Sequence, residues 1–442
     1  MSNAVAEKND NPRKPLVVRA PQAERPYAVQ SAPMADEASR SATDDVPAEM
    51  DIAVPRSGAT RRFSVYRPEA AFALIDELKH LSRRAIEPNV FFDPRFLVPA
   101  MPRLDERSVR LMVVRDEGPS RSRLRLLMPY TTERTFPLRG IPIIRAWAHP
   151  FGRLGTLPLD SDDPHDTLAS FFQMLTAADV SMPEVLVLPE TRTDGSFAEV
   201  LRSVTDAARL PVRTVNEFTR AGLLKSDDAA SFEQPVSARR LRELRRQRRL
   251  LKALGPVSFH VAREPEEVRL ALEEFLNLEA RGWKGKARSA MVLDRYRAAF
   301  AREAVNALGA EGRARIFSLS VGERTVASLV TLIDGNEAFA WKMAYDETLA
   351  KASPGQQVVC EATRAILTDP ALSQADSCAM PDHFVMNRFW SSRIPVATYV
   401  IGLKPGSDRT VELAARGILR TQRARNTLRL ARRRLQKALS LD

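Results

Sequence analysis

Along most of the chain, hydrophobic and polar residues alternate with the period of a β-strand or of an α-helix. In the first half, the alternation around Phe63 predicts a strand, and an apolar stripe at helical spacing predicts a helix after it. The elements expected there are strands at 61–66, 109–117, 122–133 and 184–190, and helices at 68–85, 167–175 and 195–209.

The second half repeats this alternation of strands and helices. Its expected strands are 257–263, 313–321, 324–334, 336–346 and 395–403, and its expected helices are 237–255, 266–283, 293–308 and 356–367. The pattern therefore predicts a mixed α/β (α+β) protein with two similar units in tandem. No sequence repeat is visible between the units, so the periodicity by itself does not demonstrate a duplication.

Changes in composition divide the chain into five segments. The first is rich in Pro, Ala, Ser, Asp and Glu and shows no periodicity, which is typical of a disordered tail. The expected segments are a disordered tail at 1–58, an N-terminal domain at 59–235, a basic inter-domain helix at 236–255, a C-terminal domain at 256–405 and a basic C-terminal helix at 406–442.

The composition is that of a protein with an ordinary hydrophobic core. Of the 442 residues, 44% are hydrophobic and 28% are charged, and only two are cysteines, Cys360 and Cys378. Two cysteines argue against a disulfide framework or a thiolate metal site. The first residues lack the apolar core of a secretory signal, and no run approaches a membrane span. We therefore expect a cytoplasmic protein.

The positive charge is concentrated in two helices. Residues 237–254 carry a net charge of +7 and residues 416–437 carry +9, whereas the whole chain carries +12. The remainder of the chain is therefore close to neutral, and the high isoelectric point does not indicate a DNA-binding fold. The C-terminal helix suits either peripheral contact with anionic lipid or a solvated helix packed by Leu419, Leu428, Leu430 and Leu435.

A strand–loop–helix segment at 338–367 suits the binding of an anion. The strand is expected to end near Tyr345, a loop to include Ser353 and Gly355, and a helix to begin at Gln356. The first N–H groups of a helix and its dipole attract anions, and glycine lets a phosphate approach the backbone. A pyrophosphate such as that of coenzyme A would fit. An ordinary helix start, with Ser353 as the N-cap and Pro354 after it, explains the same residues.

The segment 375–390 gathers polar side chains that suit proton transfer. His383 beside Asp382 is a candidate general base for removing the proton of an attacking amine. Alternatively, the segment is a loop whose acidic residues cap turns while Phe384, Phe389 and Trp390 pack.

A third segment, 278–290, follows a predicted helix and suits an acceptor pocket. Trp283 and Lys284 could line such a pocket, although a helix end at Gly282 followed by a basic loop explains them equally well. The five histidines show no metal-ligand spacing, and the chain has neither a nucleophile elbow nor a nucleotide-hydrolase phosphate loop. We therefore expect no metal.

Together with three upstream segments, these stretches resemble the CelD-like branch of the GNAT superfamily of N-acyltransferases, associated with cellulose and exopolysaccharide synthesis in bacteria. The resemblance rests on FFDPRFLVPAM, GIPIIRAWAHPFGRLGTLPLD, the basic helix ending at Leu254 and Gly255, LEARGWKGKARSA, AYDETLAKASPGQQVVCEA and DSCAMPDHFVMNRFW.

The resemblance implies two tandem GNAT-like acyltransferase domains, similar to the Fem-type aminoacyltransferases. Acetyl-CoA or another acyl-CoA would bind the second domain, where strands near 340–345 would splay around the thioester. The site residues implied or suggested by their positions are Tyr345, Ser353, Gly355, Gln356 and Gln357 for the donor, Glu279, Trp283, Lys284 and Trp390 for the acceptor, and His383, Asp382 and Asp376 for catalysis. Gly355 is the only glycine of the donor loop.

The expected function is acyl transfer to an amine or sugar acceptor, linked to polysaccharide or cellulose biosynthesis. The expected partners are a small-molecule or saccharide acceptor and a polysaccharide-synthesis complex. Two other functions fit the same features. One is a Fem-type transferase that takes aminoacyl groups from tRNA, with the basic helices steering RNA. The other is a non-catalytic scaffold of a polysaccharide-synthesis complex.

Overall fold

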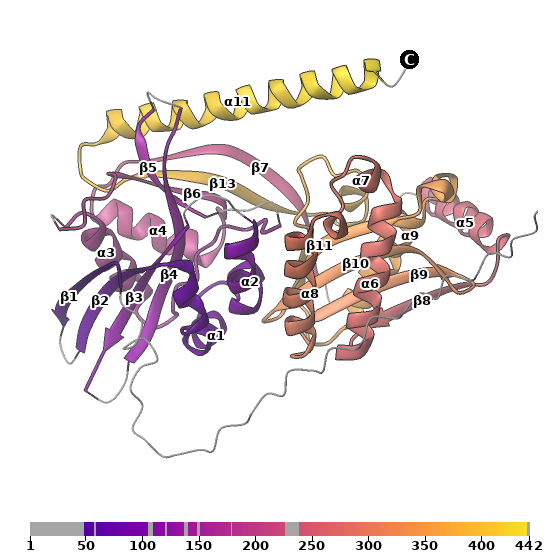
Figure 1. Ribbon diagram of the computed structural model, residues 1–442, viewed down its shortest axis with the longest axis horizontal. Coiled ribbons are helices and arrows are strands. Elements are labelled where there is room, and N and C mark those ends of the chain that lie inside the picture. Colours follow the sequence, from indigo (N-terminus) through magenta and orange to yellow (C-terminus); the bar gives the residue numbers. More distant parts are fainter. Residues whose placement is uncertain are drawn as a thin grey trace, which may run out of the picture. The chain divides into compact units, whose positions relative to one another are not determined.

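The chain folds around one long β-sheet, which the computed structural model shows in Figure 1. The structure describes residues 48–56, 59–104, 109–119, 122–136, 140–147, 151–177, 179–225 and 238–439. The strands are β1 (Met50–Arg56), β2 (Ala59–Tyr66), β3 (Arg110–Glu117), β4 (Ser122–Arg134), β5 (Pro142–Ala146), β6 (Val185–Arg192), β7 (Val212–Leu224), β8 (Val257–Ala262), β9 (Ala314–Val321), β10 (Arg324–Asp334), β11 (Glu337–Tyr345), β12 (Gln374–Asp376) and β13 (Ser392–Gly402).

Strands β2–β6 of the first half and β8–β12 of the second half are arranged in the same order, and β1 is an additional edge strand. Across the sheet, the strands run β1-β2-β3-β4-β5-β6-β13-β7-β12-β11-β10-β9-β8. Within the described residues, β5 pairs with β6 and β11 pairs with β12 in parallel, and the other pairs are antiparallel. The predicted fold class, two tandem units of mixed α/β structure, is confirmed.

The last strand of each half crosses to the other half. β7 belongs to the first half by sequence but pairs with β12, and β13 belongs to the second half but pairs with both β6 and β7. The predicted boundary near residue 235 therefore does not separate two independent sheets. The strand at 395–403 was expected to close the C-terminal domain, yet its ladder lies against β6 and β7.

Helices cover both faces of the sheet in the second half. On one face lie α6 and α8, which contact each other, and on the other face α9 packs on β9, β10 and β11. The helices longer than one turn are α1 (Ile75–Arg84), α2 (Pro94–Leu104), α3 (Pro164–Leu175), α4 (Ser196–Ala207), α5 (Ala238–Lys252), α6 (Pro265–Arg281), α8 (Arg295–Gly309), α9 (Pro354–Thr368) and α11 (Asp408–Leu439).

Aromatic packing joins the halves on the α6/α8 face. Phe96 of α2 lies edge-on to Phe300 of α8, with 5.0 Å between ring centroids. The Phe91 ring meets Phe339 of β11 at 5.8 Å in the same geometry. These rings belong to one continuous core that includes side chains of both halves. The segment FFDPRFLVPAM therefore supplies packing between the halves.

A buried ionic cluster lies where the exchanged strands meet. Asp376 of β12 accepts hydrogen bonds from Arg220 of β7 at 2.6 Å and from Arg192 of β6 at 2.9 Å. Arg192 also donates to Glu337 of β11 at 2.9 Å. These four side chains come from four different strands, and each is at most 8% exposed. Breaking such a pair is costly because it leaves a buried charge without its partner.

Two predicted segments differ from the structure at the N-terminal end. The expected disordered tail ran to residue 58, but Met50–Arg56 forms β1, antiparallel to β2. Most of its side chains are exposed, so this edge strand lacks a hydrophobic pattern. Residues 1–47 lie outside the described residues. The expected helix at 68–85 is a 3-10 turn at Pro68–Phe72 followed by α1.

The basic C-terminal helix α11 is partly core and partly exposed. Its first turns pack against β7 and β13 through Val411, Ala414, Ala415 and Ile418. From Gln422 to Leu428 every side chain is exposed, including Leu428 at 61%. Leu430 and Leu435 lie outside the side chains that the structure describes. No helix in the described part of the chain is long and apolar enough to span a membrane.

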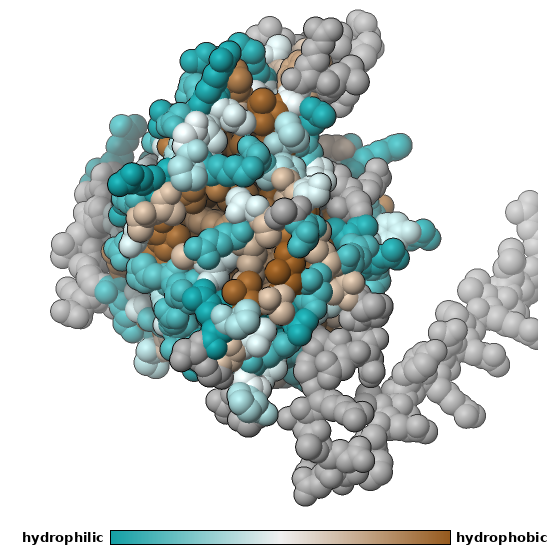
Figure 2. All heavy atoms as spheres, turned by 90° about the vertical axis from the view of Figure 1, so that its left-hand side faces the viewer, coloured by the Kyte–Doolittle hydropathy of each residue, from teal (hydrophilic) through white to brown (hydrophobic). Residues whose placement is uncertain are grey.

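The surface of the first half mixes hydrophobic and hydrophilic residues. In the view of Figure 2, brown residues form several small groups between teal ones. Scattered apolar residues of this kind are ordinary on a folded protein and do not by themselves mark a binding surface.

Candidate active site

β11 and β12 pair over only three residues and then separate. Their parallel ladder joins Glu337, Ala338 and Phe339 to Gln374, Ala375 and Asp376, where β12 ends. From Ala340 to Tyr345, β11 pairs only with β10 among the described strands. The other edge of β11 thus presents backbone N–H and C=O groups that are free to bind an extended ligand.

A β-bulge lies within this free edge. Val330 of β10 faces Lys342, but the next residue, Thr331, faces Ala340, so Trp341 is the extra residue in β11. A bulged residue is left out of the ladder, which frees its backbone groups. The Trp341 indole donates to the Phe151 carbonyl at 2.9 Å and holds that loop of the first half against β11. A free N–H at such a position can stabilise the oxygen of a reacting carbonyl.

The loop after β11 is held by acidic side chains. Asp346 accepts from the Thr348 N–H at 2.9 Å and caps a 3-10 turn at Glu347–Ala352. Glu347 accepts from the Trp283 N–H at 2.7 Å, which links this loop to the end of α6. Ser353 then adopts a left-handed conformation, with φ 47°, and α9 begins at Pro354. The predicted strand–loop–helix is therefore present.

Cationic side chains gather at the start of α9. Arg388 donates to Gln356 at 3.0 Å, and Arg248 of α5 donates to Gln357 at 3.4 Å. Burial, followed by repulsion from Arg240, lowers the pKa of Arg388 below its ordinary value. This region therefore brings positive charges close together, and an added anion would relieve their repulsion.

Several predicted donor residues position the loop. The Ser353 hydroxyl accepts from Gln247 of α5 at 3.0 Å, and buried Gln357 donates to the Ala352 carbonyl at 2.8 Å. A Cβ on Gly355 would lie 3.0 Å from Cδ1 of Tyr345. The tyrosine ring thus lies against Gly355 and leaves little room for a larger residue, a packing reason for glycine that the sequence had not suggested.

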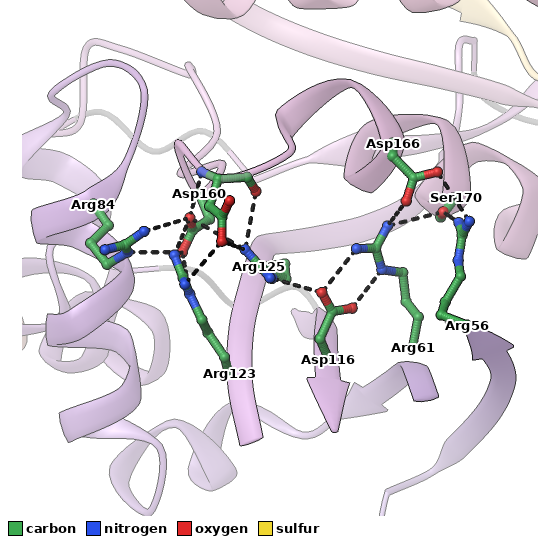
Figure 3. Close-up of polar contacts among 10 residues, drawn as sticks. Arg56, Arg61, Arg84, Asp116, Arg123, Arg125, Asp160, Asp166 and Ser170 are labelled. Atoms are coloured by element: carbon green, nitrogen blue, oxygen red, sulfur yellow. Dashed lines mark hydrogen bonds and ion pairs between the residues drawn. The ribbon is translucent and has the colours of Figure 1, made fainter. Parts of the chain in front are cut away.

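The start of α3 in the first half offers a contrast. α3 also begins with a left-handed residue, Asp163, followed by a proline. Here the arginines already have carboxylate partners (Figure 3). The shortest ion pairs are Arg61–Asp116 at 2.6 Å, Arg123–Asp160 at 2.6 Å, Arg125–Asp116 at 2.7 Å and Arg61–Asp166 at 2.7 Å. The protein's own carboxylates thus neutralise these arginines, so this end of the first half does not favour a bound phosphate.

The end of α6 and the end of β11 form a shared cavity. Its lining includes Glu279, Trp283 and Lys284 of the predicted acceptor segment and Tyr345 and Glu347 of the predicted donor segment. Buried Glu279 accepts from the Lys284 ammonium at 2.6 Å and from the Met291 N–H at 2.8 Å. Trp283 is 57% exposed. The structure therefore brings together two sequence motifs that are about 60 residues apart.

The predicted catalytic residues do not line this cavity. Burial raises the pKa of Asp376, but Arg220 and Arg192 outweigh it and hold the pKa below its ordinary value. Fully buried and ion-paired, Asp376 is a structural residue, contrary to our prediction. His383 accepts from the Met386 N–H through Nδ1 at 3.2 Å, and burial lowers its pKa. Asp382 is exposed.

Trp390 was predicted to bind substrate but belongs to the core. It is 1% exposed, and its indole N–H donates to the Thr363 hydroxyl of α9 at 3.0 Å. A side chain in this position fixes the 377–390 loop to α9. The alternative in which this segment packs its aromatic residues therefore accounts for Trp390.

Sequence reasoning missed Lys342, which interrupts the apolar strand 338–345. Its ammonium lies 4.3 Å from the ring centroid of Phe151, and burial, reinforced by Lys284, lowers its pKa to about 7. A lysine between a tryptophan and a methionine in a central strand was the available signal. Arg388 and the basic helix α5 were visible in the sequence, but their approach to α9 was not.

The family comparison addresses the same part of the chain. Residues 238–380 match the family model described as an acetyltransferase (GNAT) domain. These residues have a GNAT acyltransferase fold. No curated protein matches the sequence significantly.

Several solved structures are similar over most of their length. FemX is 8% identical, with coverage of 75% of this chain and 96% of that one and a TM-score of 0.48. A conserved protein of unknown function from Bacteroides thetaiotaomicron is 9% identical, with coverages of 75% and 97% and a TM-score of 0.45. A tandem GNAT protein from the clavulanic acid biosynthesis pathway is 11% identical, with coverages of 78% and 99% and a TM-score of 0.32. At these values the likenesses say nothing about the substrate of this chain.

Proposed function

We propose that the protein transfers an acyl group from an acyl-CoA, such as acetyl-CoA, to an amine or sugar acceptor. The observation that carries this proposal is the separation of β11 from β12, which leaves the bulged edge Ala340–Tyr345 free and leads directly to the start of α9. An extended pantetheine chain can pair with such an edge, as an added strand would.

The start of α9 suits the phosphates of the donor. Arg388, Arg248 and Arg240 surround a helix end whose dipole favours an anion. The arginines at the start of α3 already pair with carboxylates. Arg248 also lies 3.7 Å from Glu361, so the contrast that supports a donor site in the second half rests on Arg388, whose hydrogen-bond partner is the neutral amide of Gln356.

The acceptor is proposed to lie at the cavity between α6 and β11. Exposed Trp283 offers an aromatic face to a sugar or an apolar group, and the Glu279–Lys284 pair supplies polar contacts at its wall. Direct transfer needs the attacking nitrogen and the thioester carbon to be held together, which two adjoining sites on β11 would achieve. A link to polysaccharide synthesis rests only on the sequence resemblance.

Calorimetry with acetyl-CoA tests the donor site. Arg388→Glu should weaken binding about 10–100-fold, because a hydrogen bond to a charged group contributes about 1.5–3 kcal/mol. The matched control is Arg364→Glu, which reverses a partly exposed charge on the second half of α9 and should change the Kd less than about 3-fold. Equal effects of the two variants, or no binding by the wild type, would refute the proposal.

The two alternative functions, a tRNA-dependent transferase and a non-catalytic scaffold, predict different results in binding experiments. A tRNA-dependent transferase would bind aminoacyl-tRNA with a steep salt dependence and would not need acyl-CoA. A scaffold would bind neither. The exposed arginines of α5 suit the phosphates of tRNA as well as those of acyl-CoA. The free edge of β11, in contrast, favours a donor with an extended chain, such as acyl-CoA.

A further inference from the structure

Lys342 places an amine beside the free edge of β11. It follows the bulged residue Trp341 in the strand, and its ammonium lies 6.0 Å from the Trp341 ring centroid. The Phe151 ring, from the first half, is closer at 4.3 Å. The amine therefore lies against a side chain of the first half and near charged groups of α6 and α8, Glu279 and Arg297.

This amine has no acidic partner of its own. Within the described part of the chain, Lys342 forms no hydrogen bond or ion pair. The nearby carboxylate, Glu279, is engaged by Lys284 at 2.6 Å and by the Met291 N–H at 2.8 Å. A lysine that only filled space would extend its ammonium to water or to a carboxylate. Here the ammonium lies over an aromatic ring, which offsets only part of its desolvation.

The charges around Lys342 favour its neutral form. Burial has the largest effect and is reinforced by neighbouring cations, and the pKa falls to about 7. The charged groups that face it are Lys284 after α6, Glu279 on α6, Arg153 on the loop from the first half and Arg297 on α8. Three of these four are cations, so the group can exchange a proton near neutral pH.

The same residues connect Lys342 to the proposed acceptor site. Glu279 and Lys284 influence the Lys342 amine and also line the cavity with Trp283. Met343 and Ala344, the next residues of β11, line that cavity as well. Lys342 does not itself line the cavity, but it directly precedes these two lining residues in β11, and a proton acceptor must lie near the attacking atom.

We infer that Lys342 accepts the proton of the attacking amine in the acyl transfer proposed above. The inference rests on that proposed function. The neutral Lys342 amine takes a proton from the acceptor nitrogen while that nitrogen bonds to the thioester carbon. The carbon–sulfur bond breaks, the sulfur leaves as a thiolate, and the thiolate takes a proton from the lysine ammonium. The amide and the CoA thiol are then formed, Lys342 is neutral again, and no further reactant is needed.

The ionisation of Lys342 can be measured without any turnover. The intact protein is acetylated for short times with acetic anhydride from pH 5 to pH 10, and each lysine is quantified by mass spectrometry. Acetylation follows the neutral fraction, so Lys342 should show a midpoint near pH 7, well below the ordinary lysine value of about 10.4, and exposed Lys286 serves as the reference. A midpoint for Lys342 close to that of Lys286 overturns the inference.

Kinetics then test the role of the amine. We would follow CoA release from acetyl-CoA with glucosamine, and with a panel of other amines, against pH. Arginine in Lys342→Arg stays positively charged and cannot accept a proton, so it should lower kcat about 10²–10⁴-fold and remove the limb near pH 7, with the Kd for acetyl-CoA unchanged. Lys286→Arg should match the wild type.

The outcomes separate this inference from the proposed function. If acetyl-CoA binds and Lys342→Arg keeps the wild-type rate and pH profile, Lys342 is not the proton acceptor and the proposed function stands. If no acetyl-CoA binds, or no amine supports CoA release, both the inference about Lys342 and the proposed function are refuted. A loss of rate in Lys342→Arg that is accompanied by a weaker Kd for acetyl-CoA would assign the residue to donor binding and would overturn the inference.

Discussion

Asp376→Asn provides a direct test of the buried cluster that joins the exchanged strands. Asparagine keeps the size of the side chain and can still accept from the Cys378 N–H, now at 2.8 Å. It removes the negative charge that faces Arg192 at 2.9 Å and Arg220 at 2.6 Å. Arg192 retains Glu337, and Arg220 retains the Arg153 carbonyl, so both guanidiniums lose only part of their partners.

The expected loss of unfolding free energy is about 3–5 kcal/mol, because removing one partner of a buried pair leaves an uncompensated charge. This is a large fraction of the roughly 5–15 kcal/mol that stabilises a typical protein. Urea unfolding can be followed by the fluorescence of Trp341 and Trp390, which are both buried. The control is Asp382→Asn, at an exposed position, where we expect a change within about 0.5 kcal/mol.

The stability that Asp376 contributes should also depend on pH. The pKa of Asp376 in the folded protein lies below its ordinary value of 3.8. The ionised carboxylate therefore contributes stability that is present above about pH 4 and is lost as the pH falls through the lowered value. The difference between wild type and Asp376→Asn should shrink in acid. A change below about 1 kcal/mol at pH 7, or one equal to that of Asp382→Asn, would refute a structural role for Asp376.

Other substitutions distinguish packing from binding. Trp390→Phe removes the hydrogen bond to Thr363 and should cost about 1–3 kcal/mol in urea unfolding, with the Kd for acetyl-CoA unchanged. Trp283→Ala, at an exposed position, should leave stability within about 0.5 kcal/mol and raise the KM for the acceptor; an unchanged KM would remove Trp283 from the acceptor site. Burial raises the pKa of Glu87, so its stabilising contribution is present in acid and is lost as the pH rises through that value. Glu87→Gln should therefore gain stability relative to wild type between pH 4 and pH 7, and a constant difference would contradict this. Deletion of residues 423–442 should shift Tm by less than about 2 °C, because the described side chains there are exposed; any sedimentation with anionic vesicles should then be lost if this end contacts lipid.

The periodic segments of the chain were predictable because the residues on their buried face are apolar and recur with the period of a helix or a strand. The helix expected at 356–367 is α9 at Pro354–Thr368, and the strand expected at 324–334 is β10 with the same bounds. β7 was missed, since its charged residues Arg213, Glu217 and Arg220 give no clear alternation. Arg220 is buried there only because Asp376, from a distant segment, neutralises it.

The sequence by itself determined which segments form strands and helices, where the positive charge is concentrated, and which motifs resemble a GNAT domain. Tertiary structure alone decided the exchange of β7 and β13, since antiparallel pairing depends on which edges meet and not on local pattern. It also decided the chemistry of single side chains. Asp376 and Lys342 are both ionisable residues in strands of the sheet, but Asp376 faces two arginines and Lys342 faces mainly other cations. Because the interaction of charges depends on their separation in space, the roles of these two residues could not be deduced from the order of amino acids.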